Sequence, residues 1–234
     1  MILDLGLIDY EDCHKIQKEL VAKRKCGDSG DVFILAEHPN VFTIGRTGKR
    51  ENLLVDESRL ADKGVKVLDV ERGGDITFHG PGQLIVYPIV DLKQRGRDIH
   101  RHLRDLERVA IGLLNKYGVA SGAIKGKTGV WLNDEKIGSI GVAATNWVTY
   151  HGMSINVNVD LSYFAMINPC GMQDVTMTSL KKVLGKEVLM SEARDRLQGS
   201  IIDIFGPEED RSTGQYAARH GVKSGKTHNQ GGKA

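Results

Sequence analysis

Apolar residues recur every three or four positions in three long stretches of the chain, which is the spacing of one buried helix face. These stretches are residues 10–26, 98–117 and 191–205, and we expect an amphipathic helix over each. Two shorter helices are predicted over 57–63, where a glycine follows, and over 160–167, where an Asn-Pro pair follows.

Runs rich in β-branched and aromatic residues predict the strands. The runs at 32–38 and 41–45 are separated by Pro39-Asn40, which indicates a hairpin or another strand pair joined by a tight turn. Because strands and helices are interleaved without strict βαβ alternation, the fold class is predicted to be α+β. The remaining strand segments are predicted at 66–72, at 76–92 with a bend at 80–82, and at 119–124, 129–133, 136–144 and 154–161, with turns at 133–134 and 151–152.

The composition is that of an ordinary globular protein. The chain has 234 residues, 40% of them hydrophobic and 26% charged, which fits one large domain or two small ones. A net charge of +2 does not favour bulk nucleic-acid binding. The sequence lacks a run of about 18 apolar residues, and its first residues are acidic where a secretion signal would be basic. We therefore expect a cytoplasmic protein that does not bind membranes.

The character of the chain changes after Gly206. Residues 207–234 are polar and carry almost no large apolar side chains, so they cannot bury enough surface to offset the entropy of ordering. We expect residues 1–206 to form a single domain and residues 207–234 to be a disordered tail.

Cysteine chemistry centres on Cys170. The chain has three cysteines, too few and too widely spaced for a disulfide framework or a zinc site, and histidines and acidic residues show no metal-ligand spacing, so no metal is expected. Cys170 stands between Pro169 and Gly171, on a low-bulk turn that would present its sulfur. The sequence supports equally well a small apolar residue that fills a gap.

A reactive cysteine needs a partner, because a free thiol has a pKa of about 8.5 and carries little thiolate at neutral pH. Lys136 begins a strand of small residues, where an exposed hairpin lysine would be the ordinary interpretation. Close to a thiol, its ammonium would favour the thiolate, or a desolvated lysine could take the thiol proton and return it to the leaving group. His79 and His151 each precede a glycine and make a cysteine–histidine pair the competing hypothesis.

The segment 72–83, RGGDITFHGPGQ, combines four glycines with arginine, threonine, histidine and glutamine. Glycines are costly inside a plain strand but suit a backbone that lies close to a ligand. A glycine-rich turn between two core strands is the simpler alternative. The segment is not a phosphate-binding loop, because no Gly-Lys-Ser/Thr and no helix follow it.

Four segments resemble one known family. RGGDITFHGPGQLIVYPIVDL closely resembles the signature of the octanoyltransferases, also called lipoyl(octanoyl) transferases or lipoate–protein ligase B, and EKIGSIGV, HGMSINVNVDL and FAMINPCGM are similar to its later blocks in the same order. The resemblance runs from about residue 2 to about residue 205. It implies a fold like the biotin and lipoate ligases (class II synthetase-like), with a mixed β-sheet packed with helices and a smaller sheet.

The resemblance also implies an activity. Family members take octanoyl from octanoyl-acyl carrier protein as a thioester on a cysteine, and pass it to a lysine ε-amine as the first step of protein lipoylation. The acceptors would be lipoyl domains of 2-oxo acid dehydrogenase acyltransferase subunits and the glycine cleavage H protein. No cofactor is implied, and we expect a monomer, with residues 1–206 as the catalytic domain.

Carried over by position, the resemblance assigns Cys170 as the nucleophile and Lys136 as the group that activates it. The substrate-binding residues that it implies are Arg72, Gly73, Gly74, Asp75, Ile76, Thr77, Phe78, His79, Ser139, Ile140, Gly141, Gly152, Met153 and Ser154.

Two other functions remain open from the sequence. An ATP-dependent lipoate or biotin ligase on the same fold would activate a free acid as an adenylate and would not need Cys170. A non-catalytic module that holds an acyl chain or a lipoyl domain would never form an acyl-enzyme.

Overall fold

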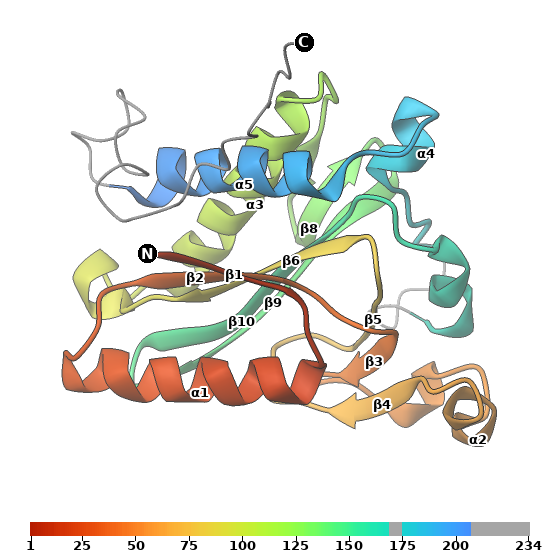
Figure 1. The fold of residues 1–234 in the computed structure, drawn as a ribbon, viewed down its shortest axis with the longest axis horizontal. Helices are drawn as coiled ribbons and strands as arrows, with labels where there is room; N and C mark the ends of the chain where they lie inside the picture. Colours follow the sequence, from red (N-terminus) through yellow and green to blue (C-terminus); the bar gives the residue numbers. More distant parts are fainter. Residues whose placement is uncertain (169–174, 207–234) are drawn as a thin grey trace, which may run out of the picture.

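The structure, a computed structural model, describes residues 1–168 and 175–206 (Figure 1). Within these residues, the larger of two sheets has seven strands in the order β1-β2-β6-β10-β9-β8-β7. β1 pairs with β2 in parallel, and the other neighbours are antiparallel. The bounds are β1 (Ile2–Leu7), β2 (Val32–Glu37), β6 (Gln83–Ile89), β7 (Gly122–Ile124), β8 (Lys127–Leu132), β9 (Glu135–Thr145) and β10 (Val148–Asn156).

The smaller sheet lies beside one end of the larger sheet (Figure 1). Its strand order is β4 (Lys66–Asp69), β3 (Val41–Ile44) and β5 (Ile76–His79), with β3 parallel to β4 and antiparallel to β5. The helices are α1 (Tyr10–Cys26), α2 (Glu57–Ala61), α3 (Ile99–Asn115), α4 (Leu180–Leu184) and α5 (Met190–Phe205), and the 3₁₀ segments are η1 (Arg50–Asn52), η2 (Leu92–Arg95) and η3 (Leu161–Met166).

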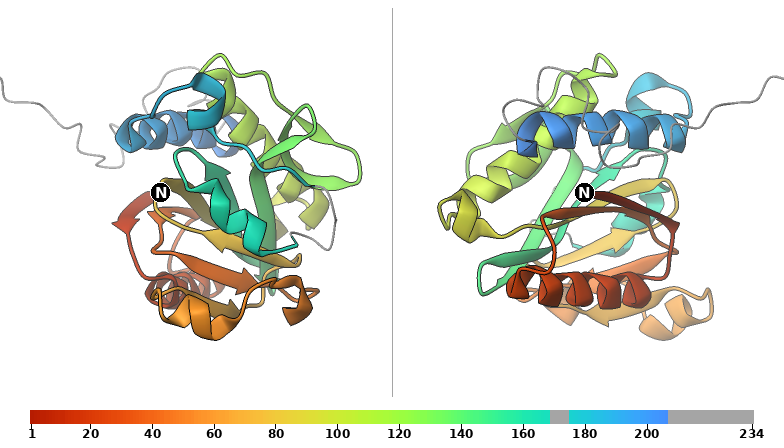
Figure 2. Two further views of the ribbon diagram at one scale, coloured as in Figure 1. Left: turned by 90° about the vertical axis from the view of Figure 1, so that its right-hand side faces the viewer. Right: turned by 60° about the vertical axis from the view of Figure 1, so that its left-hand side comes forward.

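Helices cover both faces of the larger sheet (Figure 2). In β2, Phe33 and Leu35 belong to the core formed with α3 and α5, whereas Ile34 and Ala36 pack toward α1. Successive side chains of a strand point to opposite faces, so a strand between two helical layers is apolar along its whole length. This is why β2 is buried at every residue.

The three long helices are confirmed, and their ends follow from local chemistry. Asp9 begins α1, where its carboxylate accepts a hydrogen bond from the backbone N–H of Glu11 (2.9 Å), and Gly27 ends it with a φ of 83°. Asp98 caps α3 in the same way by accepting from the N–H of Arg101. Among the described helices, none has the length and apolar character that crossing a bilayer requires.

The predicted pairing of residues 32–38 with residues 41–45 is wrong. β2 belongs to the larger sheet and β3 to the smaller one, and His38-Pro39-Asn40 carries the chain between them. Pro39 has no N–H to donate to a ladder. The ring of His38 is held elsewhere, with Nδ1 2.7 Å from the carbonyl oxygen of Ile8 and Nε2 2.8 Å from the hydroxyl of Tyr87.

The predicted turn at His151-Gly152 is also wrong, since both residues lie inside β10. The hairpin turn before β10 is Asn146-Trp147, and both of its residues have positive φ (50° and 70°), as two-residue hairpins often require. Gly152 has a different reason to be glycine: a Cβ there would lie 2.0 Å from the carbonyl oxygen of Val86 on β6.

Gly152→Ala should therefore destabilise the protein by about 3 kcal/mol or more, because backbone on β6 would have to move. Gly122→Ala is the matched control, since a Cβ at Gly122 meets no atom within 4 Å. Thermal or urea unfolding of both variants measures the difference. Equal stability of the two variants would contradict the close approach of β10 to β6.

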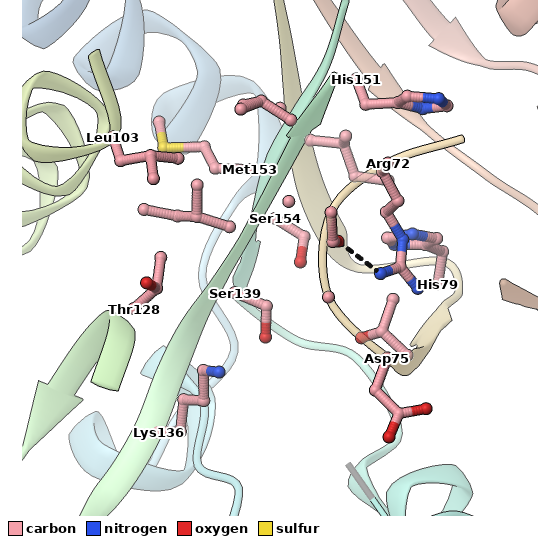
Figure 3. Close-up of a pocket in the computed structure, with 18 of the residues that line it drawn as sticks. Arg72, Asp75, His79, Leu103, Thr128, Lys136, Ser139, His151, Met153 and Ser154 are labelled. Atoms are coloured by element: carbon pink, nitrogen blue, oxygen red, sulfur yellow. Dashed lines mark hydrogen bonds between the residues drawn. The ribbon is translucent and has the colours of Figure 1, made fainter. Parts of the chain in front are cut away.

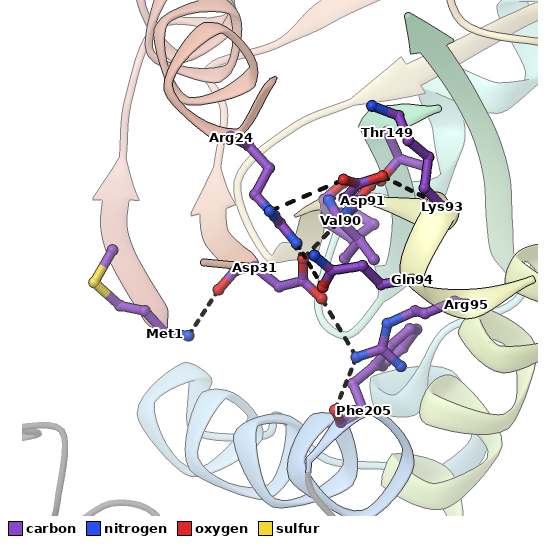
Figure 4. A network of polar contacts seen from close by, with 11 residues as sticks. Met1, Arg24, Asp31, Val90, Asp91, Lys93, Gln94, Arg95, Thr149 and Phe205 are labelled. Atoms are coloured by element: carbon purple, nitrogen blue, oxygen red, sulfur yellow. Dashed lines mark hydrogen bonds and ion pairs between the residues drawn. The ribbon is translucent and has the colours of Figure 1, made fainter. Parts of the chain in front are cut away.

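A partly buried polar network joins α1, η2 and α5 through Asp31, the residue before β2 (Figure 4). The Asp31 carboxylate accepts from Nε of Arg24 (2.9 Å), from the backbone N–H of Asp91 (3.2 Å) and from Nη2 of Arg95 (3.4 Å). Nη2 of Arg95 also donates to the carbonyl oxygen of Phe205, the last residue of α5 (3.1 Å). The Asp31 carboxylate thus connects the end of α1, in one helical layer, through Arg95 to the end of α5 in the other layer.

Candidate functional site

A cavity of about 460 Å³ lies between segment 72–77 and strands β9 and β10 (Figure 3). This volume is within the usual range for a small-molecule site. Lys136 and Ser139 point into the space from β9, opposite Arg72 and Asp75. The apolar part is built from Ile99, Leu103, Ile140 and Met153, which lie on α3, β9 and β10.

All but one of the residues predicted to bind substrate line this cavity. The exception is Phe78, which is fully buried in the core of the smaller sheet, where its ring stacks on Tyr163 with 4.4 Å between centroids. Phe78 points to the opposite face of β5 from Thr77 and His79 and packs into the core cluster that includes Phe42 and Phe164. The lining residues are Arg72, Gly73, Gly74, Asp75, Ile76, Thr77, His79, Ser139, Ile140, Gly141, Gly152, Met153 and Ser154.

Other lining residues escaped prediction. Tyr10 and Tyr87, Leu103 on α3, Thr128 on β8 and Phe164 on η3 come from elements far apart in the sequence. Their apolar or hydroxyl side chains look like ordinary core or strand residues, so only the assembled fold identifies them.

The glycines of segment 72–74 allow backbone to pack against backbone. The N–H of Gly73 donates to the carbonyl oxygen of Val142 on β9 (2.9 Å). A Cβ on Gly141 would lie 2.6 Å from the carbonyl oxygen of Gly73, and one on Gly45 would lie 2.3 Å from that of Gly74. The backbone of Gly73 and Gly74 was expected to lie close to a ligand. Here it lies close to other segments of the cavity wall, at Gly141 and Gly45.

Arg72 links the cavity wall to the smaller sheet. It is 8% exposed, and its Nη2 donates to the carbonyl oxygen (2.6 Å) and the hydroxyl (2.9 Å) of Thr43 on β3. Nη1 donates to the carbonyl oxygen of Gly73 (3.1 Å). The guanidinium therefore holds the loop that carries it.

Buried side chains connect His79 to the segment around Thr178, which follows the predicted catalytic residue in the sequence. Nδ1 of His79 lies 2.6 Å from Oε1 of Gln83, while Nε2 of Gln83 donates to Oδ1 of Asn156 (3.0 Å). The amide oxygen must accept from His79, so the hydrogen-bond pattern assigns the proton to Nδ1. Asn156 in turn donates to the carbonyl oxygen of Thr178 (3.0 Å). Burial and the neighbouring His38 lower the pKa of His79 to about 3, so this imidazole is neutral at physiological pH.

Lys136 lies at the start of β9 and is only 4% exposed, unlike the hairpin lysine that the sequence alone would suggest. Its N–H donates to the carbonyl oxygen of Thr176 (2.8 Å), and its carbonyl oxygen accepts from the N–H of Thr178 (2.9 Å). Its Nζ lies 5.4 Å from the ring centroid of Trp131. Gly129 makes room for the side chain, since a Cβ there would be 2.7 Å from Cε of Lys136.

Cys170, the predicted nucleophile, lies outside the described residues, as does the predicted tail at 207–234. The described cysteines are Cys13 and Cys26. Cys13 is fully buried, and this burial raises the pKa of its thiol to about 12, whereas Cys26 is exposed at the end of α1. Neither lines the cavity.

The sequence matches the family model of the lipoyl protein ligase A/B catalytic domain over residues 9–202. It is 45% identical over 199 residues to an octanoyltransferase of Geobacter metallireducens, covering 85% of this chain and 90% of that protein. An octanoyltransferase of Geotalea uraniireducens is 42% identical over 212 residues, covering 89% of this chain and 96% of the relative.

Solved structures show the same fold. A bipartite lipoate protein ligase from Thermoplasma acidophilum, solved in a study of that ligase and its E2 lipoyl domain, superposes with a TM-score of 0.64 at 15% identity. The superposition covers 87% of this chain and 82% of the other. The predicted α+β architecture, a mixed sheet packed with helices plus a smaller sheet, is confirmed.

Proposed function

This chain belongs to the family of lipoyl protein ligase A/B catalytic domains, and from that premise we propose that it is an octanoyltransferase that moves octanoyl from a carrier-protein thioester to a lysine of a lipoyl domain. The observation that carries the proposal is the identity of 42–45% to octanoyltransferases over most of both chains. The likeness to the ATP-dependent ligases is a likeness of fold at 15% identity. The catalytic domain is residues 1–206.

Transfer proceeds in two steps on Cys170. Its thiolate attacks the carbonyl carbon of octanoyl-acyl carrier protein, and the carrier sulfur leaves as a thiol by taking up the proton that the Cys170 thiol gave up. The ε-amine of the acceptor lysine then attacks the new thioester, forms the amide and returns a proton to the cysteine sulfur. Two protein substrates can thus use one site in turn. No ATP is consumed, because a thioester is already activated.

Lys136 is the group that activates Cys170. The described residues on both sides of the cysteine support this pairing. Before it, the N–H of Asn168 donates to the carbonyl oxygen of Asn52 (2.8 Å), whose side chain donates to Asp75 in the cavity wall (2.5 Å). After it, the backbones of Thr176 and Thr178 are hydrogen-bonded to the backbone of Lys136.

A cysteine–histidine pair is less suited to the same task. Burial, with smaller contributions from neighbouring charges, lowers the pKa of both His79 and His151 to about 3. A base with so low a pKa is a poor acceptor for a thiol proton at neutral pH. As an ammonium, Lys136 would stabilise a thiolate, and as a desolvated amine it would take the thiol proton.

The apolar part of the cavity holds the hydrocarbon chain. Leu103 and Met153 face each other there (Figure 3), and Ile99 and Ile140 complete the surface. At roughly 0.8 kcal/mol for each buried methylene, burial of an eight-carbon chain contributes several kcal/mol to binding. The polar residues Lys136, Ser139 and Ser154 then surround the thioester end.

Intact-mass spectrometry after mixing with octanoyl-acyl carrier protein tests the proposal. We expect the wild-type protein to gain the mass of one octanoyl group and to transfer it to a lipoyl domain without ATP. Cys170→Ala should lose both the adduct and transfer. Cys26→Ala is the matched control and should keep both, because this cysteine is exposed and does not line the cavity.

Retained transfer by Cys170→Ala would overturn the two-step scheme. Activity that requires ATP and free octanoic acid would identify a ligase. Absence of both adduct and transfer in the wild-type protein would indicate a binding module.

A further inference from the structure

Two histidines and a glutamate converge at the edge of the cavity, where His151 is itself a lining residue. His14 lies on α1, His151 on β10, and Glu71 between β4 and segment 72–77. Oε2 of Glu71 is 3.3 Å from Nε2 of His14 and 3.4 Å from Nε2 of His151. One possible ligand atom of each of the three residues lies within 4.8 Å of the other two, and the two imidazoles stack with 5.1 Å between centroids.

The two nitrogen–oxygen separations match the geometry of a small transition-metal ion. Zn²⁺ bonds histidine nitrogen and carboxylate oxygen at about 2.0–2.2 Å, which places neighbouring ligands of a tetrahedron about 3.3–3.5 Å apart. Both nitrogen–oxygen separations already have this length. Imidazole and carboxylate ligands suit Zn²⁺ and its first-row neighbours better than Mg²⁺, which prefers oxygen ligands.

The Nε2 atoms of the two histidines contact only Glu71 among the polar groups that the structure describes. Nε2 of His14 and Nε2 of His151 are shielded from solvent and, apart from these contacts with Glu71, have no hydrogen-bond partner there. His151 is 1% exposed, and its Nδ1 lies 3.3 Å from the hydroxyl of Tyr10. If Nδ1 donates to Tyr10, Nε2 keeps its lone pair directed at the cluster, as in metal sites whose ligands are oriented by a second hydrogen bond.

We propose that His14, Glu71 and His151 form a binding site for a divalent ion of the Zn²⁺ class, with water in the fourth position. The ligands lie far apart in sequence, which is why their spacing along the chain gives no metal signature. Because Glu71 directly precedes Arg72 of the cavity lining and His151 is itself a lining residue, a bound ion ties α1 to two walls of the cavity. The site is independent of the proposed transfer activity.

The ammonium of Lys18 lies beside Glu71 and should weaken metal binding, which allows a specific test. Nζ of Lys18 lies 2.7 Å from Oε1 of Glu71, the second oxygen of the same carboxylate, and 4.0 Å from the ring centroid of Tyr150. Its positive charge reduces the affinity of the cluster for a second cation. Lys18→Met should therefore bind the metal more tightly than the wild-type protein.

Calorimetric titration of the chelator-treated full chain with zinc chloride, together with thermal unfolding, measures the site. We expect one ion per chain and a rise in Tm on saturation. His14→Ala and Glu71→Gln should weaken affinity by about tenfold or more, while His100→Ala, an exposed histidine elsewhere, should leave it unchanged. Magnesium chloride should produce neither effect.

Cobalt(II) in place of zinc distinguishes this cluster from a cysteine site, because thiolate ligation adds an intense near-ultraviolet charge-transfer band. We expect visible tetrahedral bands without that band. Absence of saturable binding, or equal affinity in the wild-type, His14→Ala and Glu71→Gln proteins, would overturn the proposal. If His14→Ala fails to fold, His14→Gln replaces it.

Discussion

Lys136→Met should slow formation of the octanoyl-enzyme by about 10²- to 10⁴-fold, the contribution of a well-placed proton-transfer group. Methionine keeps an unbranched side chain of similar length beside Trp131 and Gly129, so packing changes little. What is lost is the charge that the proposed mechanism places beside the Cys170 sulfur. Rapid-quench intact-mass measurements with octanoyl-acyl carrier protein give the acylation rate, and thermal unfolding gives the stability.

Lys136→Arg separates the two ways in which a lysine can act. Arginine keeps the positive charge but does not release a proton in proteins. If Lys136 only stabilises the thiolate, the arginine variant should recover a large part of the rate. If it takes the thiol proton and returns it to the leaving group, arginine should be as slow as methionine. A loss of stability as large as the loss of rate, converted to free energy, would instead show that Lys136 is structural.

The helices were predictable because their signals are local. Caps such as Asp9 and Asp98, and apolar residues at helical spacing, act within one turn of the chain. Sheet membership was not predictable in this way. β2 and β3 are separated by three residues and look alike, yet they belong to different sheets, because their partners β6 and β5 lie far along the sequence.

The candidate site divides in a similar way. Residues 72–77, 139–141 and 152–154 stood out through unusual glycines and through resemblance, and the fold brings them around one cavity. Leu103 and Thr128 carry no chemical signal and join the cavity only through tertiary packing. The role of Cys170 stays a prediction, and the mass measurement on the wild-type and Cys170→Ala proteins tests it directly.

Acidification should unfold this protein near pH 5 through its buried histidines. Burial is the main cause that lowers the pKa of His38 and His102 to about 4, and of His79 and His151 to about 3. In the unfolded chain each would titrate near 6.5. Between these values the unfolded state binds protons that the folded state excludes, so their stabilising contribution is complete above pH 6.5 and is lost as pH falls.

The expected slope is steep. Each such histidine contributes about 1.4 kcal/mol per pH unit in this window, so four reach roughly 5 kcal/mol per pH unit at most. A typical domain has only about 5–15 kcal/mol of total stability. Urea unfolding at pH 7.5, 6.5 and 5.5 should therefore show a stability that falls progressively faster as the pH decreases.

His102→Leu tests the origin of this slope without touching the cavity. His102 lies on α3, is 2% exposed and packs edge-on against the ring of Phe205, and neither of its ring nitrogens has a hydrogen-bond partner among the described residues. An apolar replacement should cost little at pH 7.5 and should reduce the number of protons taken up on unfolding at pH 5.5 by about one. An unchanged proton uptake would mean that His102 has the same pKa in the folded and the unfolded protein. Burial in the core formed with α3 and α5 would then not disfavour the protonated imidazole.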